Sequence, residues 1–132
     1  MGRCKTICVA VVVRNDEILV VKDKKQDENC WRFPTGVLKN GEEYDECCIS
    51  AVADKTGQWC MFREVLKERT NEDKTKKIIY CLCESLEEKY DEGEYSYEWV
   101  NIKEAFNRDN IDIDRSLKKS IERCMVDIEE ER

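Results

Sequence analysis

Segment 36–57 holds the residues of this chain that are best placed to do chemistry. Gly36 and Glu42 stand at the ends of a short loop, and Asp54 and Gly57 lie near the end of the helix-like run that follows. This is the layout of a loop–helix–loop that handles phosphate groups and a metal ion. Mg²⁺ takes oxygen ligands, so two or three carboxylates have to converge on one face of such a helix.

Most of the expected acids are missing from the end of that helix. Residues 50–55 read Ser-Ala-Val-Ala-Asp-Lys, which leaves Asp54 as a carboxylate and puts Lys55 beside it. Aspartate is one methylene shorter than glutamate and reaches less far. A lysine at about 4 Å from Mg²⁺ would cost several kcal/mol in a partly buried site. The frame for metal chemistry is therefore present, but much of the chemistry is not.

Strands must surround this segment. Residues 6–14 are almost all apolar, which is typical of a strand buried on both faces. The turn signal at Asn15-Asp16 makes residues 17–22 the second strand of a hairpin, followed by a polar surface loop at 23–29. Residues 31–34 are expected to be extended, since the residue before a proline avoids helical angles. Three further strands are predicted, at residues 58–68, 77–87 and 94–100.

Helical spacing of apolar residues predicts three helices. The first runs from residue 42 and ends at Gly57, which supplies the C-cap. The second is short, at residues 102–107, and the third is a long amphipathic helix at 112–132. An early helix among strands, with another at the end, indicates a mixed sheet with helices on both faces. We expect one α/β domain spanning residues 1–132.

Composition limits the partners and the compartment. The 132 residues carry a net charge of −7, which disfavours a nucleic-acid backbone as the main partner because phosphate binding needs a basic surface. The apolar run at 7–13 is far too short for a membrane helix, and the first residues lack a secretory signal pattern. We therefore expect a cytoplasmic protein.

Nine cysteines and no histidine define the sulfur chemistry. An odd count without an export signal indicates reduced thiols that act as small buried hydrophobes. A structural zinc site is the alternative; it would need mainly thiolates, and no CxxC pair exists. Cys47 and Cys48 are neighbours on the first helix, and Cys81 and Cys83 share one face of a strand.

With these residues in order, the chain resembles the Nudix family, whose box reads G-x5-E-x7-R-E-U-x-E-E-x-G-U, where U is a bulky aliphatic. The box-like segment covers residues 36–58. The family pattern is kept at Gly36, Glu42, Val52 and Gly57. It is broken at Ser50, Ala51, Asp54, Lys55 and Gln58, where the family has arginine, three glutamates and an aliphatic residue.

The flanks extend the resemblance over nearly the whole chain. Lys22 ends a strand as a cation often does in the family, and Trp31 with Pro34 is similar to the family's W-x-x-P-G-G entry. Residues 98–105 look like its last strand and short helix. Asp114, which precedes an amphipathic helix, resembles the nucleotide-sanitising MutT-like branch. The resemblance implies an α/β/α sandwich with a mixed sheet.

What the resemblance implies for function is a cleft for a nucleoside diphosphate linked to another group. The family's usual reaction is the attack of water on a pyrophosphate, with Mg²⁺ held by the box. Carried over by position, Glu42 and Asp54 are the catalytic candidates, and Gly36, Asp54 and Glu98 are the metal candidates. The candidates for substrate contacts are Lys22, Trp31, Phe33, Lys55 and Asp114.

Plainer roles remain open for these residues. Lys55 is either a cation that takes the place of the lost metal and neutralises a ligand phosphate, or a solvated lysine at a helix C-terminus. Glu42 is also suited to stabilise the start of the helix, and Asp114 to cap one. Trp31 and Phe33 either stack on a base or belong to the core.

Three functions follow from this sequence. We favour a Nudix-type domain that binds a nucleotide-type ligand and has weak or absent pyrophosphohydrolase activity. The alternative is an active Mg²⁺-dependent hydrolase with displaced ligands, built from Glu42, Asp54 and Glu98. The third is a protein-interaction scaffold without catalysis. A homodimer through a sheet edge or the last helix is compatible with each of them.

Overall fold

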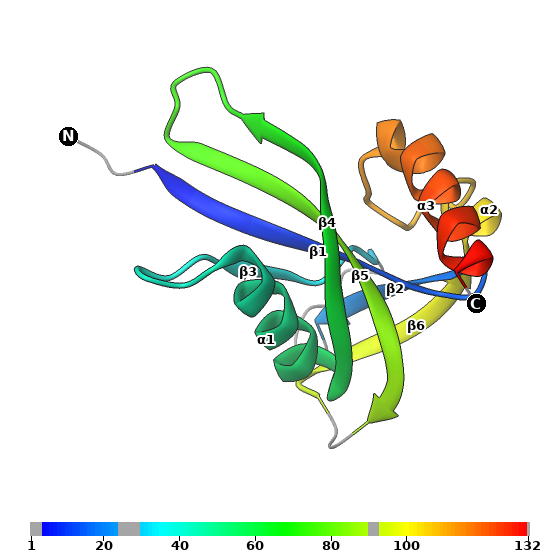
Figure 1. Cartoon of the computed structure of the whole chain (residues 1–132). Helices are drawn as coiled ribbons and strands as arrows, with labels where there is room; N and C mark the ends of the chain where they lie inside the picture. Colours follow the sequence, from blue (N-terminus) through cyan, green and yellow to red (C-terminus); the bar gives the residue numbers. More distant parts are fainter. Residues whose placement is uncertain (1–3, 24–29, 90–92, 132) are drawn as a thin grey trace.

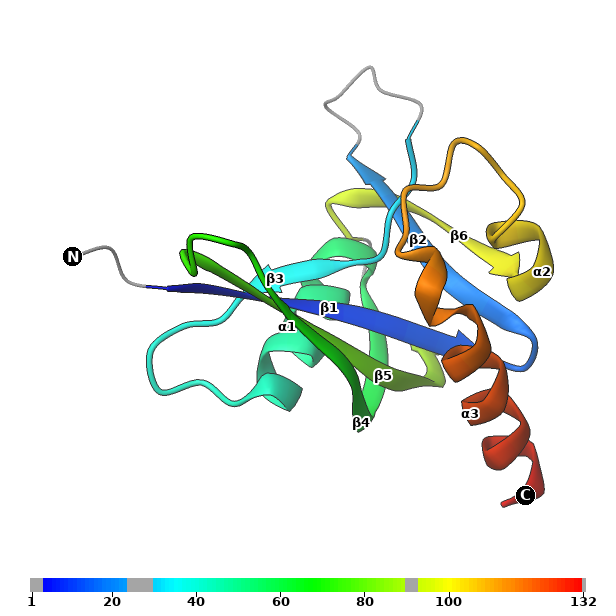
Figure 2. The same cartoon turned by 90° about the horizontal axis from the view of Figure 1, so that it is seen from above.

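The computed structural model describes residues 4–23, 30–89 and 93–131, which form three layers. The strands are β1 (Lys5–Arg14), β2 (Glu17–Asp23), β3 (Thr35–Val37), β4 (Gln58–Thr70), β5 (Lys76–Lys89) and β6 (Tyr95–Asn101). The helices are α1 (Tyr44–Thr56), α2 (Ile102–Ala105), the 3-10 helix η1 (Arg115–Leu117) and α3 (Lys118–Glu130). Helix α1 covers one face of the sheet, and α2 and α3 lie on the other (Figures 1 and 2). The predicted α/β/α arrangement is confirmed.

The sheet is mixed, as the sequence indicated. Its order is β4-β5-β1-β2-β6, and β3 pairs with β1 outside that path. β1 runs parallel to β5 and antiparallel to β2 and β3. The hairpin between β1 and β2 is tight because Asn15 adopts a φ of 54°, a conformation that asparagine tolerates. β4 and β6 form the two edges of the path.

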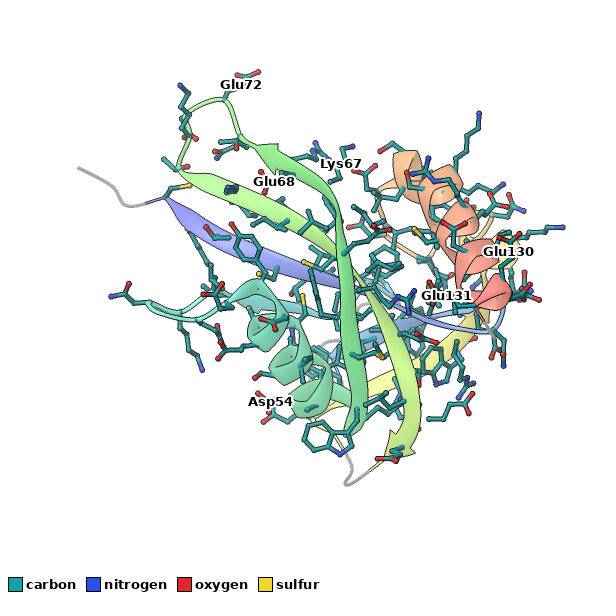
Figure 3. All side chains as sticks on the ribbon, in the orientation of Figure 1. Asp54, Lys67, Glu68, Glu72, Glu130 and Glu131 are labelled. Atoms are coloured by element: carbon teal, nitrogen blue, oxygen red, sulfur yellow. The ribbon has the colours of Figure 1, made fainter. Side chains whose placement is uncertain are left out.

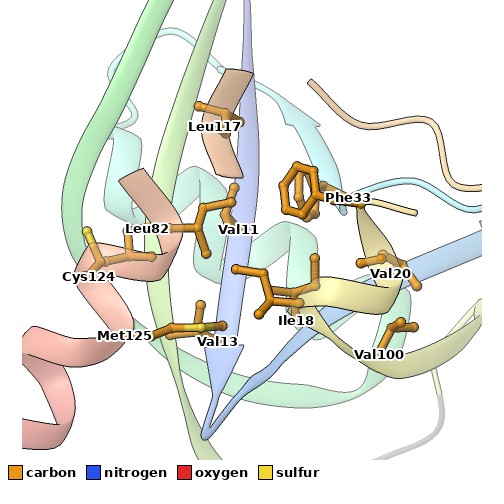
Figure 4. Packing of buried hydrophobic residues seen from close by; sticks show 14 of the residues in the cluster. Val11, Val13, Ile18, Val20, Phe33, Leu82, Val100, Leu117, Cys124 and Met125 are labelled. Atoms are coloured by element: carbon orange, nitrogen blue, oxygen red, sulfur yellow. The ribbon is translucent and has the colours of Figure 1, made fainter. Parts of the chain in front are cut away.

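Two apolar clusters fill the spaces between the layers. Figure 4 shows the cluster under α3, where Leu117, Cys124 and Met125 pack on sheet residues such as Val11 and Leu82. The cluster under α1 is rich in thiols and includes Cys8, Cys47, Cys48, Cys60, Cys81 and Cys83. All nine cysteines are free, and seven are buried. The thiols therefore serve the core as small apolar side chains.

Helix α1 is closed at its C-terminal end by backbone geometry. It begins at Tyr44, two residues later than predicted, and ends at Thr56; Gly57, whose φ is 72° and whose N–H bonds to the Ala53 oxygen at 2.8 Å, forms the expected C-cap. Gly36 is not a turn residue but lies in β3, opposite Cys8 of β1. A Cβ at Gly36 would stand 3.1 Å from the Cβ of Ala51, so this glycine permits close contact between β3 and α1.

The prediction of one long helix over 112–132 was wrong at its start. Asp114 accepts a hydrogen bond from the Ser116 N–H and caps η1, and the α-helix proper begins at Lys118. An aspartate that binds the backbone two residues ahead competes with helical hydrogen bonding, which explains the delayed start.

The predicted polar loop at 23–29 lies largely outside the described residues. None of the helices that the structure describes is long and apolar enough to cross a membrane.

Candidate functional site

A small polar pocket opens where the end of β2, the segment before β3 and the end of α1 meet. It has a volume of about 120 Å³ and contains three cations, Lys22, Arg32 and Lys55, with one carboxylate, Asp23. The remaining lining residues are Val21, Cys30, Phe33, Thr35 and Tyr95. Three cations in one small pocket of an acidic protein make it suited to bind an anion. We call it the cationic pocket.

Lys55 points into this pocket from α1. Its ammonium donates a short hydrogen bond to the carbonyl oxygen of Thr35, lies 3.5 Å from the Thr35 hydroxyl, and stands 5.2 Å from the centre of the Tyr95 ring. Burial, followed by the charge of Arg32, lowers the pKa of Lys55, and Asp23 and Asp54 oppose this shift. The Lys55 side chain is therefore fixed by its bond to Thr35 and partly desolvated, unlike a lysine that extends into solvent.

A second, larger pocket adjoins the first and shares Arg32, Phe33 and Thr35 with it. Its volume is about 380 Å³, and its other lining residues are Val9, Arg69, Tyr80, Asp112, Ile113 and Asp114. A volume of roughly 300 Å³ or more is in the range of sites for small organic ligands. We call the two neighbouring pockets together the cleft, which has a small cationic end and a wider end of mixed polarity.

Asp114 lies at the wide end and already has several partners. Its carboxylate accepts hydrogen bonds from the Ser116 hydroxyl at 2.6 Å and from Lys67 at 3.2 Å, and it pairs with Arg69 at 3.3 Å. Burial by itself would raise the pKa of Asp114, but the bonds from Ser116 and Lys67 hold it at about 2. Asp114 is therefore ionised near neutral pH and serves as a cap, whatever its role toward a ligand.

The aromatic candidates occupy the wall of the cleft. Phe33 is buried in the core and lines both pockets. Trp31 packs against the same core, its backbone bonds to Asn110 and Asp112, and its ring lies 5.1 Å from the Lys22 ammonium. Both residues therefore belong to the hydrophobic core or pack against it. Of the two, Phe33 also lines the cleft.

The structure does not bring the candidate metal ligands together. Glu42 accepts a hydrogen bond from the backbone of Lys39 at the start of α1, while Asp54 lies exposed near its other end (Figure 3). Glu98 pairs with Arg108 at 3.0 Å, and its register with Val20 places it on the sheet face opposite α1. Among residues 4–23, 30–89 and 93–131, no three His, Cys, Asp or Glu side chains are grouped to hold a metal.

Comparison with known proteins shows the family of this chain. A family model described as NUDIX domain matches residues 5–123. The chain belongs to the Nudix family. Nudix hydrolases generally use a divalent metal such as Mg²⁺.

Curated relatives match the chain over part of their own length. Nudix hydrolase 2 of Arabidopsis thaliana is 30% identical over 74% of this chain and 39% of its own. Nucleoside diphosphate-linked moiety X motif 6 of Xenopus laevis is 29% identical over 52% of this chain and 34% of its own. The chain thus spans between a third and two fifths of these relatives.

Solved Nudix structures share the fold at low identity. A Nudix hydrolase from Nitrosomonas europaea has a TM-score of 0.75 at 16% identity, with 95% of this chain and 72% of that chain covered. A MutT protein from Methanosarcina mazei Go1 has a TM-score of 0.68 at 17% identity, with 92% and 95% covered. A UDP-X diphosphatase has a TM-score of 0.63 at 16% identity, with 78% and 53% covered.

The box of this Nudix chain does not fit the family's metal. At the positions of the family's box glutamates, Ala51 carries no ligand, Lys55 is a cation and Asp54 is exposed. The Gly36 carbonyl belongs to β3, one peptide away from the Thr35 carbonyl that already accepts from Lys55. A divalent ion beside that ammonium would meet strong repulsion and too few oxygen ligands.

Some of the residues that line the two pockets were not predicted from the sequence. Thr35, Arg69 and Tyr95 have no distinguishing pattern, since each is an ordinary strand residue. Arg69 reaches the cleft because β4 and β5 extend as a long hairpin beside the loop at 112–114. Strand lengths and bulges decide this placement, and neither can be read from residue types alone.

Proposed function

We propose that this Nudix domain binds a nucleoside diphosphate derivative in the two-part cleft and hydrolyses it weakly or not at all. The carrying observation is the pair of adjoining pockets that share Arg32, Phe33 and Thr35. The cationic pocket suits a diphosphate, and the wide pocket suits the attached organic group, for which Phe33, Tyr80 and Asp114 provide an apolar wall, an aromatic edge and a carboxylate. The name of one curated relative, nucleoside diphosphate-linked moiety X motif 6, supports this class of ligand.

The weak hydrolysis follows from the metal-facing side of α1. Family hydrolysis needs carboxylates that hold Mg²⁺ and orient water. Here Ala51 and Lys55 take two of those places, and Glu42 is engaged at the other end of the helix. An active enzyme with displaced ligands would have to recruit Glu98. That residue lies on the face of the sheet opposite α1 and is bound to Arg108.

A thermal-shift experiment tests the ligand class. ADP, ADP-ribose and UDP-glucose are each added to the protein with EDTA and with Mg²⁺, and product release is followed in parallel. A ligand at about 100 times its dissociation constant adds roughly 2.7 kcal/mol to stability, so a bound nucleotide raises the melting temperature measurably. Arg32→Gln should lose the shift, whereas Arg123→Gln, an equal change of charge on the exposed side of α3, should keep it.

Two outcomes would contradict the proposal. If no nucleotide changes the melting temperature with or without Mg²⁺, the scaffold function is favoured. If product release requires Mg²⁺ and proceeds at a rate typical of enzymes, about 1 s⁻¹ or faster, the domain is an active hydrolase.

A further inference from the structure

Lys55 occupies a position at which the family box carries a carboxylate, and it reverses the charge there. Its side chain is not turned away to solvent: the ammonium is anchored on the Thr35 carbonyl at the wall of the cationic pocket. Thr35 is the residue before Gly36, whose carbonyl is the family's candidate metal contact. The cation of the side chain thus lies beside the group that would otherwise face a metal ion.

Among the described residues that line this pocket, cations outnumber carboxylates. Within residues 4–23, 30–89 and 93–131, neither Lys55 nor Arg32 has a carboxylate within ion-pair distance. Asp23 lines the pocket and has interactions of its own. The pKa of Lys55 is lowered by burial and by Arg32, which means that the two cations oppose each other. An anion between them would remove this repulsion.

We propose that the Lys55 ammonium replaces the divalent metal of this site and holds a diphosphate oxygen directly, so that ligand binding needs no metal ion. The inference rests on the proposed function, since it assumes a ligand with a diphosphate. Arg32 supplies a planar guanidinium for a second oxygen, and Lys22, which also lines the pocket, adds positive charge. Phosphate oxygens are well bound by such charge-assisted hydrogen bonds.

Calorimetric titration of the whole chain tests this substitution, with inorganic pyrophosphate and ADP as probes in EDTA and in Mg²⁺. We expect both probes to bind in EDTA at least as tightly as in Mg²⁺, because free Mg²⁺ competes with the protein for the diphosphate. Lys55→Gln should weaken binding in EDTA about tenfold or more, the equivalent of losing one charged contact. Lys55→Arg keeps the charge and should retain most of the affinity.

Lys39→Gln is the matched control, since Lys39 is an exposed lysine in the loop at the other end of α1. It should leave both affinities unchanged. Melting temperatures of all variants, measured without ligand, separate a loss of binding from a loss of folding. Lys55→Glu provides a second readout: it should abolish binding in EDTA and restore part of it when Mg²⁺ is present.

The outcomes distinguish this inference from the function on which it rests. Binding of ADP that requires Mg²⁺, or equal affinities of the wild type and Lys55→Gln in EDTA, would overturn the role of Lys55 and leave the nucleotide cleft intact. Absence of binding under every condition would overturn both.

Discussion

Neighbouring residues on α1 have opposite surroundings. Lys55 is half-buried and reaches the Thr35 carbonyl, whereas Asp54 is exposed. Spacing along a helix places residues 51, 54 and 55 on one broad face, yet the structure divides that face: Ala51 is buried against β3 and Asp54 lies toward solvent. At the scale of single residues, the box keeps side chains that pack, whereas Ala51 and Lys55 stand at positions where the family box has glutamates.

Thiol reactivity is the first prediction at this scale. Burial, together with the neighbouring Cys8 and Glu42, raises the pKa of Cys47 to about 12, and burial together with Glu64 raises that of Cys124 to about 11. Because the thiolate is the reactive form, the buried cysteines should resist alkylation in the native protein. Mass spectrometry after brief treatment with iodoacetamide should find modification at Cys4 and Cys30, the two that are not buried. Fast labelling of Cys47 would contradict this.

The ion pairs of Asp114 predict a dependence of stability on pH. The folded-state pKa of about 2 lies below the ordinary value of 3.8, so the stabilising contribution is present above pH 4 and is lost as the pH falls toward 2. Asp114→Asn should therefore lower the free energy of unfolding by about 1–2 kcal/mol at pH 6, mainly through loss of the charged contacts with Lys67 and Arg69, because asparagine can still cap the helix. In urea titrations the difference from the wild type should shrink by pH 3. A difference independent of pH would show that the carboxylate charge is not responsible.

At the scale of elements, β3 and α1 are in close contact because Gly36 has no side chain. An added Cβ would meet Ala51 at 3.1 Å and the sulfur of Cys47 at 3.2 Å. This contact fixes the distance between the Thr35 carbonyl and the end of α1, and so positions Lys55 in the pocket. The box glycine has a packing role here that does not depend on a metal.

Gly36→Ala tests this packing. The extra methyl group should destabilise the protein by about 1–3 kcal/mol, because the layers have to move apart. Ala51→Gly removes the closest obstacle, so the double variant should be less destabilised than the sum of the two single variants. Urea unfolding of the four proteins measures this coupling. Strict additivity would show that Gly36 and Ala51 do not limit the contact.

The sequence predicted the elements better than the cleft they form. Hydrophobic patterning located β1, β2 and α1, and the turn signal at Asn15 located the hairpin, because each of these depends on local residues. The start of α3 was placed too early, since a capping aspartate competes with the helix. The neighbours of Lys55 and Arg69 could not be predicted, because they depend on how β3 meets α1 and on the bulges of β4. The functional roles of the individual site residues stay predictions.

The chain combines a net negative charge with a cationic pocket formed by described residues. A net charge of −7 repels anions at a distance, so an anionic ligand gains its affinity from short contacts inside the cleft. Such contacts favour a small ligand whose diphosphate enters the pocket over a long polyanion that would cover the surface. The distribution of charge therefore agrees with a nucleotide-type ligand and disfavours nucleic acid.

The central claim is that this Nudix domain keeps a ligand cleft and lacks most of the metal chemistry. The most direct test is the rate at which the purified chain hydrolyses a bound nucleotide, measured with ADP-ribose and UDP-glucose at saturating concentration, in Mg²⁺ and in EDTA. We predict a rate at least about a thousandfold below the roughly 10 s⁻¹ of a typical enzyme, with no dependence on Mg²⁺. Turnover near 10 s⁻¹ that requires Mg²⁺ and is lost in Asp54→Asn would contradict the claim.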